Sequence, residues 1–438
     1  MSTAIELPHA KRTLPNGLDV LVHEDRRVPI VAVNLWYHVG SKNERIGRTG
    51  FAHLFEHLMF EGSEHYNGGY FTPLQQAGAL LNGSTNTDRT NYWEVVPTSA
   101  LELALWMESD RMGYLLPALT RERFETQRDV VLNERRQNYE NRPYGMALMA
   151  LSAALFPPEH PYHWLTIGAE EDIRAMEFED VRAFFRTYYH PANASLALAG
   201  DIDTEHAFEL AEQYFGDMPA GTKPQPVEAD ASLSREIRLV LEDRVELPRL
   251  YIAWHSPAMF HDGDAEADLL ADLLANGKTS RLYRLLVYEK RIALDVSAYQ
   301  HSREISSFFL LAATAAPGQS LTDIVALIDE CIGELIDEGP TNHEMERGIA
   351  QAEAHFMYRL QTVGGFGGKS DQLNAYNVFR GNPDFFGGDL ERYRRATSET
   401  VRKAARAYLA FDRRVLLSIV PRGKDALALA GSERVVVS

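Results

Sequence analysis

The sequence predicts an α+β protein made of two homologous sandwich domains, each a mostly antiparallel sheet with helices on one face. Three observations support this prediction. The chain has 438 residues, more than one domain usually holds. Prolines and glycines break every periodic pattern at residues 216–236. The halves on either side of this linker show a similar order of patterns, so we expect domains at residues 1–222 and 223–438, with one large mixed domain as the alternative.

In the first half, a strand-like apolar run at 28–41 leads into a helical pattern at 47–60, and later helices precede a strand at 194–202. A second helical pattern covers 124–145. The stretch LLNGSTNTDRTNYWEVVP, residues 80–97, is rich in β-forming residues. It predicts a strand, with a surface hairpin as the simpler alternative.

The second half repeats this order. A strand-like run at 248–259 leads into a helical pattern at 263–289, more helices follow, and a strand at 413–421 closes the half. Because each half runs from a strand into a helix and returns through a final strand, we interpret the chain as an internal duplication.

The composition is that of an ordinary globular protein, with 45% hydrophobic and 24% charged residues. The formal net charge of −18 argues against a nucleic-acid partner, because an acidic chain repels phosphate groups. The single cysteine, Cys331, excludes an intrachain disulfide and a multi-cysteine metal site. Its helical surroundings predict a buried and inert thiol.

No stretch approaches the roughly 18 apolar residues of a membrane span, so we expect no membrane partner. The N-terminus also lacks the apolar core of a secretory signal. If Met1 is the native start, a cytoplasmic protein is expected. If a signal peptide has been removed, a periplasmic protein is expected.

The stretch FAHLFEHLMFEG, residues 51–62, places three ionisable side chains in a strongly apolar helix. His53 and His57 are four residues apart, so both project from one face of the helix, one turn apart. Glu56 borders that face, and the order H-x-x-E-H is the inverted zincin motif. A buried structural histidine is the simpler interpretation of either ring alone. Three unpaired polar groups on this helix would each cost several kcal/mol, which favours a metal.

A catalytic zinc site needs three protein ligands and one open position. Glu134 is the candidate for the third ligand, within the helical pattern FETQRDVVLNERRQNYENRPYG at residues 124–145. Spacing alone does not distinguish Glu134 from Glu125 or Glu140, and a solvated helix face is the simpler interpretation of any one of these glutamates.

The stretch GRTGFAHLFEHLMFEGSEHY, followed by the glutamate of VVLNERRQ, resembles the pitrilysin family of zinc peptidases, which includes insulin-degrading enzyme and the mitochondrial processing peptidase. The resemblance implies that His53, His57 and Glu134 bind one zinc ion per chain. It implies that Glu56 is the catalytic base of peptide hydrolysis. It also implies a subunit of two α+β domains that forms half of a clamshell around a closed chamber.

The same resemblance gives the segment Asn82, Gly83, Ser84 and Thr85 a role. In the family, the matching segment is a sheet-edge strand beside the zinc. A free strand edge can pair with an extended peptide, which would add to the sheet as one more strand. We therefore expect these four residues to bind the substrate backbone.

Two departures from the family pattern stand out. Many relatives carry a second glutamate seven residues before the third ligand, where this chain has Gln127. A neutral amide can still hydrogen-bond a ligand or a water molecule next to the metal.

The glycine-rich stretch VGGFGGKSDQL, residues 363–373, is either a flexible loop that contacts substrate or a connection between helices.

The second departure concerns the partner. Active relatives supply an arginine and a tyrosine, seven residues apart, from the second domain of the opposing half-shell. Aligned on residues 280–282, these positions hold Val287 and Leu294. We therefore expect a heterodimer with a homologous subunit that carries the arginine and the tyrosine. A homodimer that uses Arg281 and Tyr288 is the alternative.

Together these observations predict a zinc-dependent endopeptidase that cleaves peptides or unfolded segments inside a chamber formed with a partner subunit. A non-catalytic scaffold subunit of the same fold is the first alternative. A zinc hydrolase acting on a small non-peptide substrate is the second.

Overall fold

The structure is a computed structural model that describes residues 6–437. It contains two six-stranded sheets, and the prediction of an α+β protein with two sheet domains is confirmed. The chain forms two compact units around these sheets. Unit 1 comprises the described residues up to Asn133, Thr166–Val227 and His355–Asp389, and unit 2 comprises Glu134–Leu165, Glu228–Ala354 and Leu390 onward.

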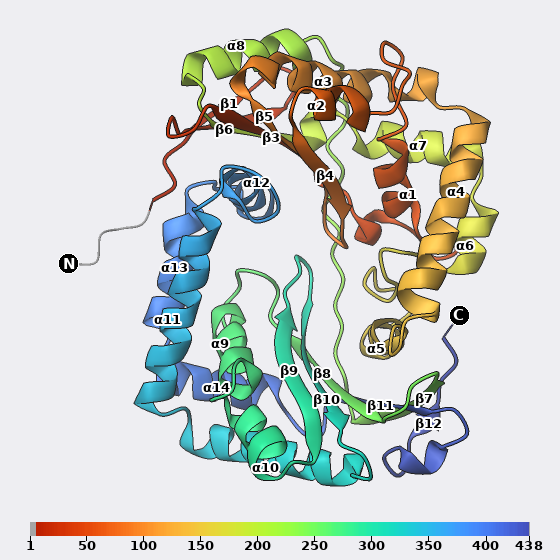
Figure 1. The fold of residues 1–438 in the computed structure, drawn as a ribbon, viewed down its shortest axis with the longest axis vertical. Coiled ribbons are helices and arrows are strands. Elements are labelled where there is room, and N and C mark those ends of the chain that lie inside the picture. The colour runs from red at the N-terminus through yellow and green to blue at the C-terminus, as the bar shows by residue number, and fades with distance from the viewer. Residues whose placement is uncertain (1–5, 438) are drawn as a thin grey trace. The chain divides into compact units, whose positions relative to one another are not determined.

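The first sheet has the strand order β1-β2-β6-β3-β5-β4, so β4 lies at one edge (Figure 1). The β2–β6 pair is parallel, and the other neighbours are antiparallel. The stretch at residues 80–97 is a hairpin, β4–β5, rather than one strand. The strands are β1 (Ala10–Thr13), β2 (Asp19–Glu24), β3 (Ile30–Tyr37), β4 (Leu80–Thr85), β5 (Thr90–Pro97) and β6 (Ala194–Gly200).

The second sheet has the order β12-β7-β11-β8-β10-β9. Its segment β7-β11-β8-β10-β9 repeats the order and directions of β2-β6-β3-β5-β4, including the one parallel pair. This repeat agrees with the internal duplication inferred from the sequence. The strands are β7 (Ile237–Asp243), β8 (Arg249–Ser256), β9 (Ala293–His301), β10 (Ser307–Ala315), β11 (Val415–Pro421) and β12 (Glu433–Arg434).

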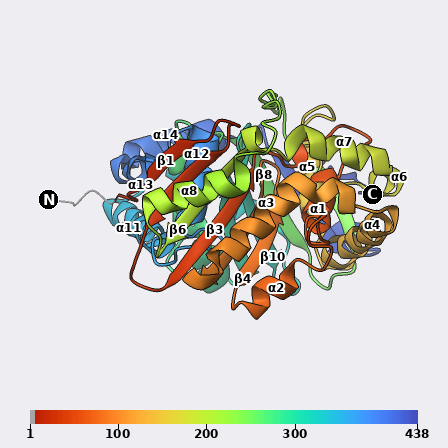
Figure 2. The same ribbon diagram turned by 90° about the horizontal axis from the view of Figure 1, so that it is seen from above.

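Helices α3 and α8 cover one face of the first sheet (Figure 2), and α12 packs on the opposite face against β6, β3 and β2. The stretch at residues 363–373 connects α11 to α12 and forms the start of α12. The helices that precede the linker are α1 (Phe51–Leu58), α2 (Phe71–Gln76), α3 (Leu101–Ala118), α4 (Arg121–Arg135), α5 (Ala147–Leu155), α6 (Glu170–Ala175), α7 (Phe178–Tyr188) and α8 (Thr204–Phe215).

Helices α9, α10 and α14 pack on one face of the second sheet, and α5 packs on the other. The helical pattern at 263–289 is interrupted, because α9 ends at Ala275 and a π-helical turn, Tyr283–Glu289, follows after a break. The helices after the linker are α9 (Asp264–Ala275), α10 (Leu321–Glu338), α11 (Asn342–Arg359), α12 (Lys369–Arg380), α13 (Phe385–Arg395) and α14 (Ser398–Tyr408).

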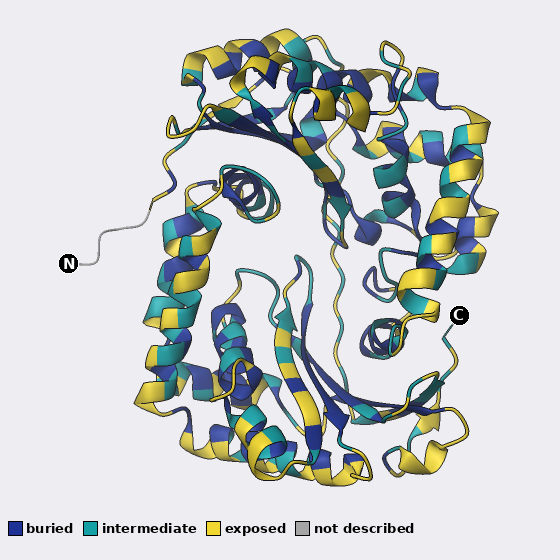
Figure 3. Ribbon diagram, viewed as in Figure 1, coloured by how far each residue is buried: buried dark blue, intermediate teal, exposed yellow. Residues whose placement is uncertain are grey.

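Strand β8 shows why the second sheet is covered on both faces. Leu250, Ile252 and Trp254 point into the core with α9, α10 and α14, whereas Tyr251 and Ala253 point into the core with α5. Because side chains alternate along a strand, a continuous apolar run buries both faces. Figure 3 shows the central strands of both sheets largely buried, the edge strands β4 and β9 partly exposed and the outer helix faces exposed.

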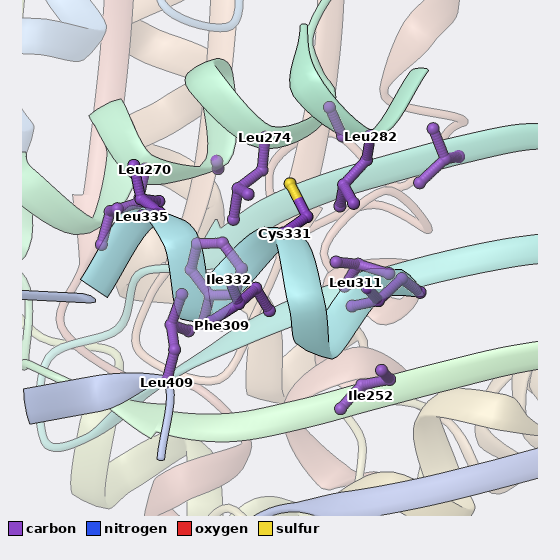
Figure 4. Packing of buried hydrophobic residues seen from close by; sticks show 14 of the residues in the cluster. Ile252, Leu270, Leu274, Leu282, Phe309, Leu311, Cys331, Ile332, Leu335 and Leu409 are labelled. Atoms are coloured by element: carbon purple, nitrogen blue, oxygen red, sulfur yellow. The ribbon is translucent and has the colours of Figure 1, made fainter. Parts of the chain in front are cut away.

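Cys331 on α10 lies in the first of these cores, beside Leu274 and Leu282 (Figure 4). Burial raises the pKa of its thiol to about 11. The thiol is therefore protonated and unreactive at neutral pH, as the sequence predicted.

Each unit takes one helix from the half of the sequence that supplies the other sheet. Helix α5 precedes the linker but packs in unit 2, and α12 follows the linker but packs in unit 1. A division at residue 222 therefore separates the two sets of strands but not the two packing units. Among the described residues, no helix is both long enough and apolar enough to cross a bilayer.

Candidate metal centre

Helix α1, which carries the H-x-x-E-H motif, is capped by the side chain of Glu44 in the preceding loop. Its N-cap, Gly50, has a φ of 92°, which a glycine adopts without strain. The carboxylate of Glu44 accepts hydrogen bonds from the backbone N–H groups of Gly50 (3.0 Å) and Ala52 (2.9 Å). A carboxylate at this end also interacts favourably with the helix dipole. The start of α1 is therefore held in place by loop residues as well as by its own packing.

The apolar side of α1 buries Phe51, Ala52, Leu54, Phe55 and Leu58. The Phe55 ring packs on those of α7, for example 5.9 Å from the centre of Phe185. This packing fixes the rotation of α1 about its axis. The remaining side of the helix, which is only half-buried, carries His53, Glu56 and His57.

The structure brings His53, His57 and Glu134 together. One ligand atom of each residue lies within 4.8 Å of the others. The two imidazole rings are 4.9 Å apart between centres and nearly perpendicular, at 87°. Glu134 occupies the last turn of α4, whereas Glu125 is exposed earlier on that helix and Glu140 pairs with Arg135. Within residues 6–437, this is the one cluster of three such side chains close enough to share an ion.

The donor set fits zinc. Zinc binds imidazole nitrogen and carboxylate oxygen at about 2.0–2.2 Å, and catalytic sites use three such ligands. Three donors that already lie within 4.8 Å of one another can reach one ion by rotation of their side chains. All three side chains are half-buried, so solvent reaches the cluster.

Arg89 is a functional candidate that the sequence analysis did not identify. It lies in the turn between β4 and β5, and its guanidinium donates to the carbonyl oxygen (2.8 Å) and the hydroxyl (2.6 Å) of Ser84. Burial lowers the pKa of Arg89, and the nearby carboxylates of Asp371 and Glu56 oppose that shift. Arg89 therefore links the edge strand to the surroundings of Glu56. Its only sequence signal was an arginine in a short hairpin turn.

The predicted substrate segment lies on β4, which is an edge strand of the described part of the chain and pairs with β5. Gly83 packs directly on Phe60, just beyond the end of α1, since a Cβ at this position would be 3.0 Å from both the Phe60 and Tyr92 rings. The neighbours Asn82, Ser84 and Thr85 are exposed or half-buried. The close approach at Gly83 brings this edge next to the helix of the histidines.

Residues 19–161 match the family described as insulinase (peptidase family M16), and residues 175–352 match the domain described as the peptidase M16 inactive domain. The chain belongs to the peptidase M16 family. The resemblance to the pitrilysin family that the motif suggested is thus confirmed.

Named relatives agree with this assignment. The M16 chain is 29% identical to the zinc protease PqqE of Helicobacter pylori over 392 residues, which cover 86% of each protein. It is 25% identical over 243 residues to the mitochondrial-processing peptidase subunit beta of Blastocladiella emersonii, covering 55% of this chain and 50% of that protein.

Solved structures show the same fold. A protease from Helicobacter pylori superposes with a TM-score of 0.87 and 25% identity, over 95% of this chain and 100% of the other. The periplasmic protease PqqL from Escherichia coli superposes with a TM-score of 0.78 at 16% identity, over 98% of this chain but only 50% of PqqL. The M16 chain therefore corresponds in fold to about half of PqqL.

Two amides, one on α4 and one in the turn that follows it, donate to carboxylates. Gln127 donates to Glu61 at 2.6 Å. Asn138 donates to the carboxylate of Glu134 at 3.1 Å. Asn138 lies in a π-helical turn, Arg136–Glu140, that directly follows α4. Such turns are frequent at functional sites.

The M16 positions expected for an arginine and a tyrosine lack polar donors. Val287 packs against the core of unit 2, and Leu294 is exposed. Arg281 makes a two-pronged ion pair with Glu344, at 2.7 and 2.8 Å, and a hydrogen bond to the carbonyl of Gly339. The guanidinium of Arg281 is thus already hydrogen-bonded within its own subunit.

Proposed function

We propose that this chain is the zinc-bearing subunit of a metalloendopeptidase that cleaves peptides or unfolded segments. The observation that carries the proposal is the convergence of His53, His57 and Glu134 from two helices, with Glu56 directly before the second histidine. One zinc ion per chain is the expected cofactor, and zinc proteases are among the relatives.

In the proposed reaction, His53, His57 and Glu134 would hold the zinc, which when bound would lower the pKa of a water molecule and polarise the scissile carbonyl. Glu56 takes the proton of the attacking water and passes it to the nitrogen of the leaving amine. Arg89 interacts electrostatically with Glu56, which places a guanidinium near the proposed base. No residue forms a covalent bond to the substrate.

The substrate is proposed to bind as an extended peptide along the free edge of β4. Backbone groups of Asn82, Gly83, Ser84 and Thr85 would pair with it, as strands pair in a sheet. Backbone pairing accepts many sequences, so this part of the site supports broad specificity.

A second, homologous subunit is proposed to complete the site. Val287 and Leu294 cannot donate a hydrogen bond, and Arg281 is held by Glu344. These facts favour a heterodimer whose partner supplies an arginine and a tyrosine. Two relatives fit this arrangement, since one is named a subunit and the other is twice the length of the matching region.

The test measures zinc content and hydrolysis of a quenched fluorescent peptide, for the chain alone and mixed with a homologous subunit from the same genome. We expect about one zinc per chain and weak activity alone. We expect the partner to raise activity by roughly 10² to 10³, the usual effect of one oxyanion donor.

Two outcomes would contradict the proposal. A scaffold subunit would show no zinc-dependent hydrolysis, either alone or mixed with the homologous subunit. Full metal retention in Glu134→Ala, with loss of metal in His53→Ala, would remove Glu134 from the ligand set and leave Glu125 or Glu140 as the candidates.

A further inference from the structure

An apolar pocket of about 460 Å³ lies in unit 1, at the end of the sheet where β4 begins. Its walls include Leu80 of β4 and Trp93 and Val95 of β5. The backbone of residues 361–365, in the connection between α11 and α12, forms another wall, and Val28 also lines it. We refer to this space as the Leu80 pocket.

The strand register places the pocket walls on one face of the sheet. Leu80 pairs with Val95, which in turn pairs with Ala32, and residues opposite each other point to the same face. Gly364 lies directly on this row, since a Cβ there would be 2.5 Å from the Ala32 side chain and 2.6 Å from that of Val95. The glycine thus lets the loop lie close against the sheet and close one side of the pocket.

The pocket offers no unpaired charge. Asp25 and Arg27 both line it, but Asp25 bonds the Arg27 guanidinium at 2.6 and 2.7 Å and the Lys369 ammonium at 2.5 Å. Charges that are neutralised in this way do not attract a charged ligand. An apolar group is therefore the better match.

The walls of the pocket expose apolar surface. The apolar side chains of Leu80 and Val28 are 71% and 52% exposed. An occupant that brought an apolar surface would cover these two side chains.

We propose that the Leu80 pocket binds one apolar side chain of a peptide that lies along β4. This inference rests on the proposed peptidase function. Side chains of an added strand alternate between faces, so the peptide residue beside Leu80 points to the face of the pocket. Leu80 precedes Asn82 by two residues, about 7 Å along the strand. The pocket would thus select one substrate position a few residues from the bond that is cut.

The first experiment profiles cleavage. Digestion of a mixed peptide library by the zinc-loaded complex, read by mass spectrometry, should show enrichment of Leu, Ile, Val or Phe at one fixed distance from the cut. Val28→Lys adds a charge at an already exposed wall residue. We expect it to reduce that enrichment about tenfold and to favour Asp or Glu at the same position.

Val436→Lys is the matched control, because Val436 is 89% exposed and does not line the pocket. The control should give the wild-type profile. Identical profiles for Val28→Lys and Val436→Lys, or no apolar position in the wild type, would overturn the proposal while leaving zinc-dependent hydrolysis intact.

The second experiment measures binding without turnover. Zinc-loaded Glu56→Gln is titrated with decapeptides that carry one Leu or one Asp at successive positions. One position should bind about tenfold more tightly as Leu, and Val28→Lys in the same background should reverse the preference. This preference together with an inactive wild-type enzyme would refute the catalytic function and support the pocket. Equal affinities at every position would refute the pocket.

Discussion

Helices α1 and α9 occupy the same place in the two halves, but α1 carries the H-x-x-E-H motif and α9 does not. Each follows the strand next to the parallel pair, β3 in one sheet and β8 in the other. Each begins after a left-handed glycine, Gly50 with a φ of 92° and Gly263 with a φ of 91°. The backbone that enters the helix is therefore equivalent in the two halves.

Alignment on these glycines places Glu266, Leu269 and Leu270 where α1 has His53, Glu56 and His57. Leu269 and Leu270 are buried, at 1% and 0% exposure, in the core shared with α10 and α14. In the first half, the corresponding side chains face a half-buried site. The comparison shows that equivalent helix positions can hold apolar side chains packed in a core or the half-buried polar side chains of the cluster with Glu134.

The largest expected effect is catalytic. Glu56→Gln should keep zinc and fold but reduce hydrolysis by about 10² to 10⁴, because an amide cannot take a proton from water. Turnover of the quenched peptide and zinc content are measured together. The aligned change in the other half, Leu269→Gln, should leave the zinc content unchanged and lower the thermal stability. Undiminished hydrolysis by zinc-loaded Glu56→Gln would exclude Glu56 as the base.

Leu270→Ala and His57→Ala test the comparison at its next aligned pair. Leu270→Ala should lower the free energy of unfolding by about 2–5 kcal/mol, because it leaves a cavity in a packed core. His57→Ala should abolish zinc binding and cost less stability in the metal-free protein. Thermal melts with and without a chelator separate the two effects. Equal melting shifts for both variants without metal would show that His57 is a core residue.

Arg281→Ala tests whether this arginine serves the fold or a catalytic site. Burial tends to raise the pKa of Glu344, but hydrogen bonds from Arg281 and Thr341 outweigh burial and lower the pKa to about 2. Since the folded pKa is depressed, the stabilisation is present above the usual value near 4.5 and disappears as the pH falls towards 2. Arg281→Ala should cost about 2 kcal/mol at pH 7 and progressively less below pH 4.5.

The measurement is the thermal midpoint between pH 3 and pH 7, with Arg402→Ala as the control. Arg402 pairs with Glu399 on the exposed surface of α14, where such pairs contribute little. Loss of hydrolysis in Arg281→Ala without loss of stability would instead favour the homodimer that uses Arg281 and Tyr288.

The smallest effect is expected at Asn138. Asn138→Ala removes the hydrogen bond to Glu134 and should weaken zinc affinity about tenfold, the usual effect of a lost partner of a metal ligand. The matched control is Asn276→Ala at the end of α9. It removes a hydrogen bond from an asparagine side chain to the carboxylate four residues earlier, here Asp272, as Asn138→Ala does for Glu134. Competition with a zinc chelator measures both variants. Unchanged affinity in Asn138→Ala would show that Glu134 is held by its helix alone.

The sequence by itself determined the features that depend on local periodicity. The spacing of His53 and His57 follows from the pitch of a helix. The β structure within residues 80–97, although not its division into the two strands of a hairpin, and the burial of Cys331 follow from residue type and from the surrounding pattern. The repeated order of strands and helices predicted two sheets, because each strand pattern recurs at the same place in the other half.

Only the tertiary structure decided features that depend on distant contacts. It brought Glu134 rather than Glu125 or Glu140 to the histidines, although all three lie in one helical pattern. It moved α5 and α12 onto the sheets of the opposite halves, because each apolar sheet face needs a cover and chain order does not restrict which helix provides it. Arg89, the Arg281–Glu344 pair and the Leu80 pocket belong to this second group. In each case, some of the interacting residues are far apart in the chain, and no repeating sequence pattern relates their positions. Only the packing of side chains in the folded protein therefore reveals these interactions.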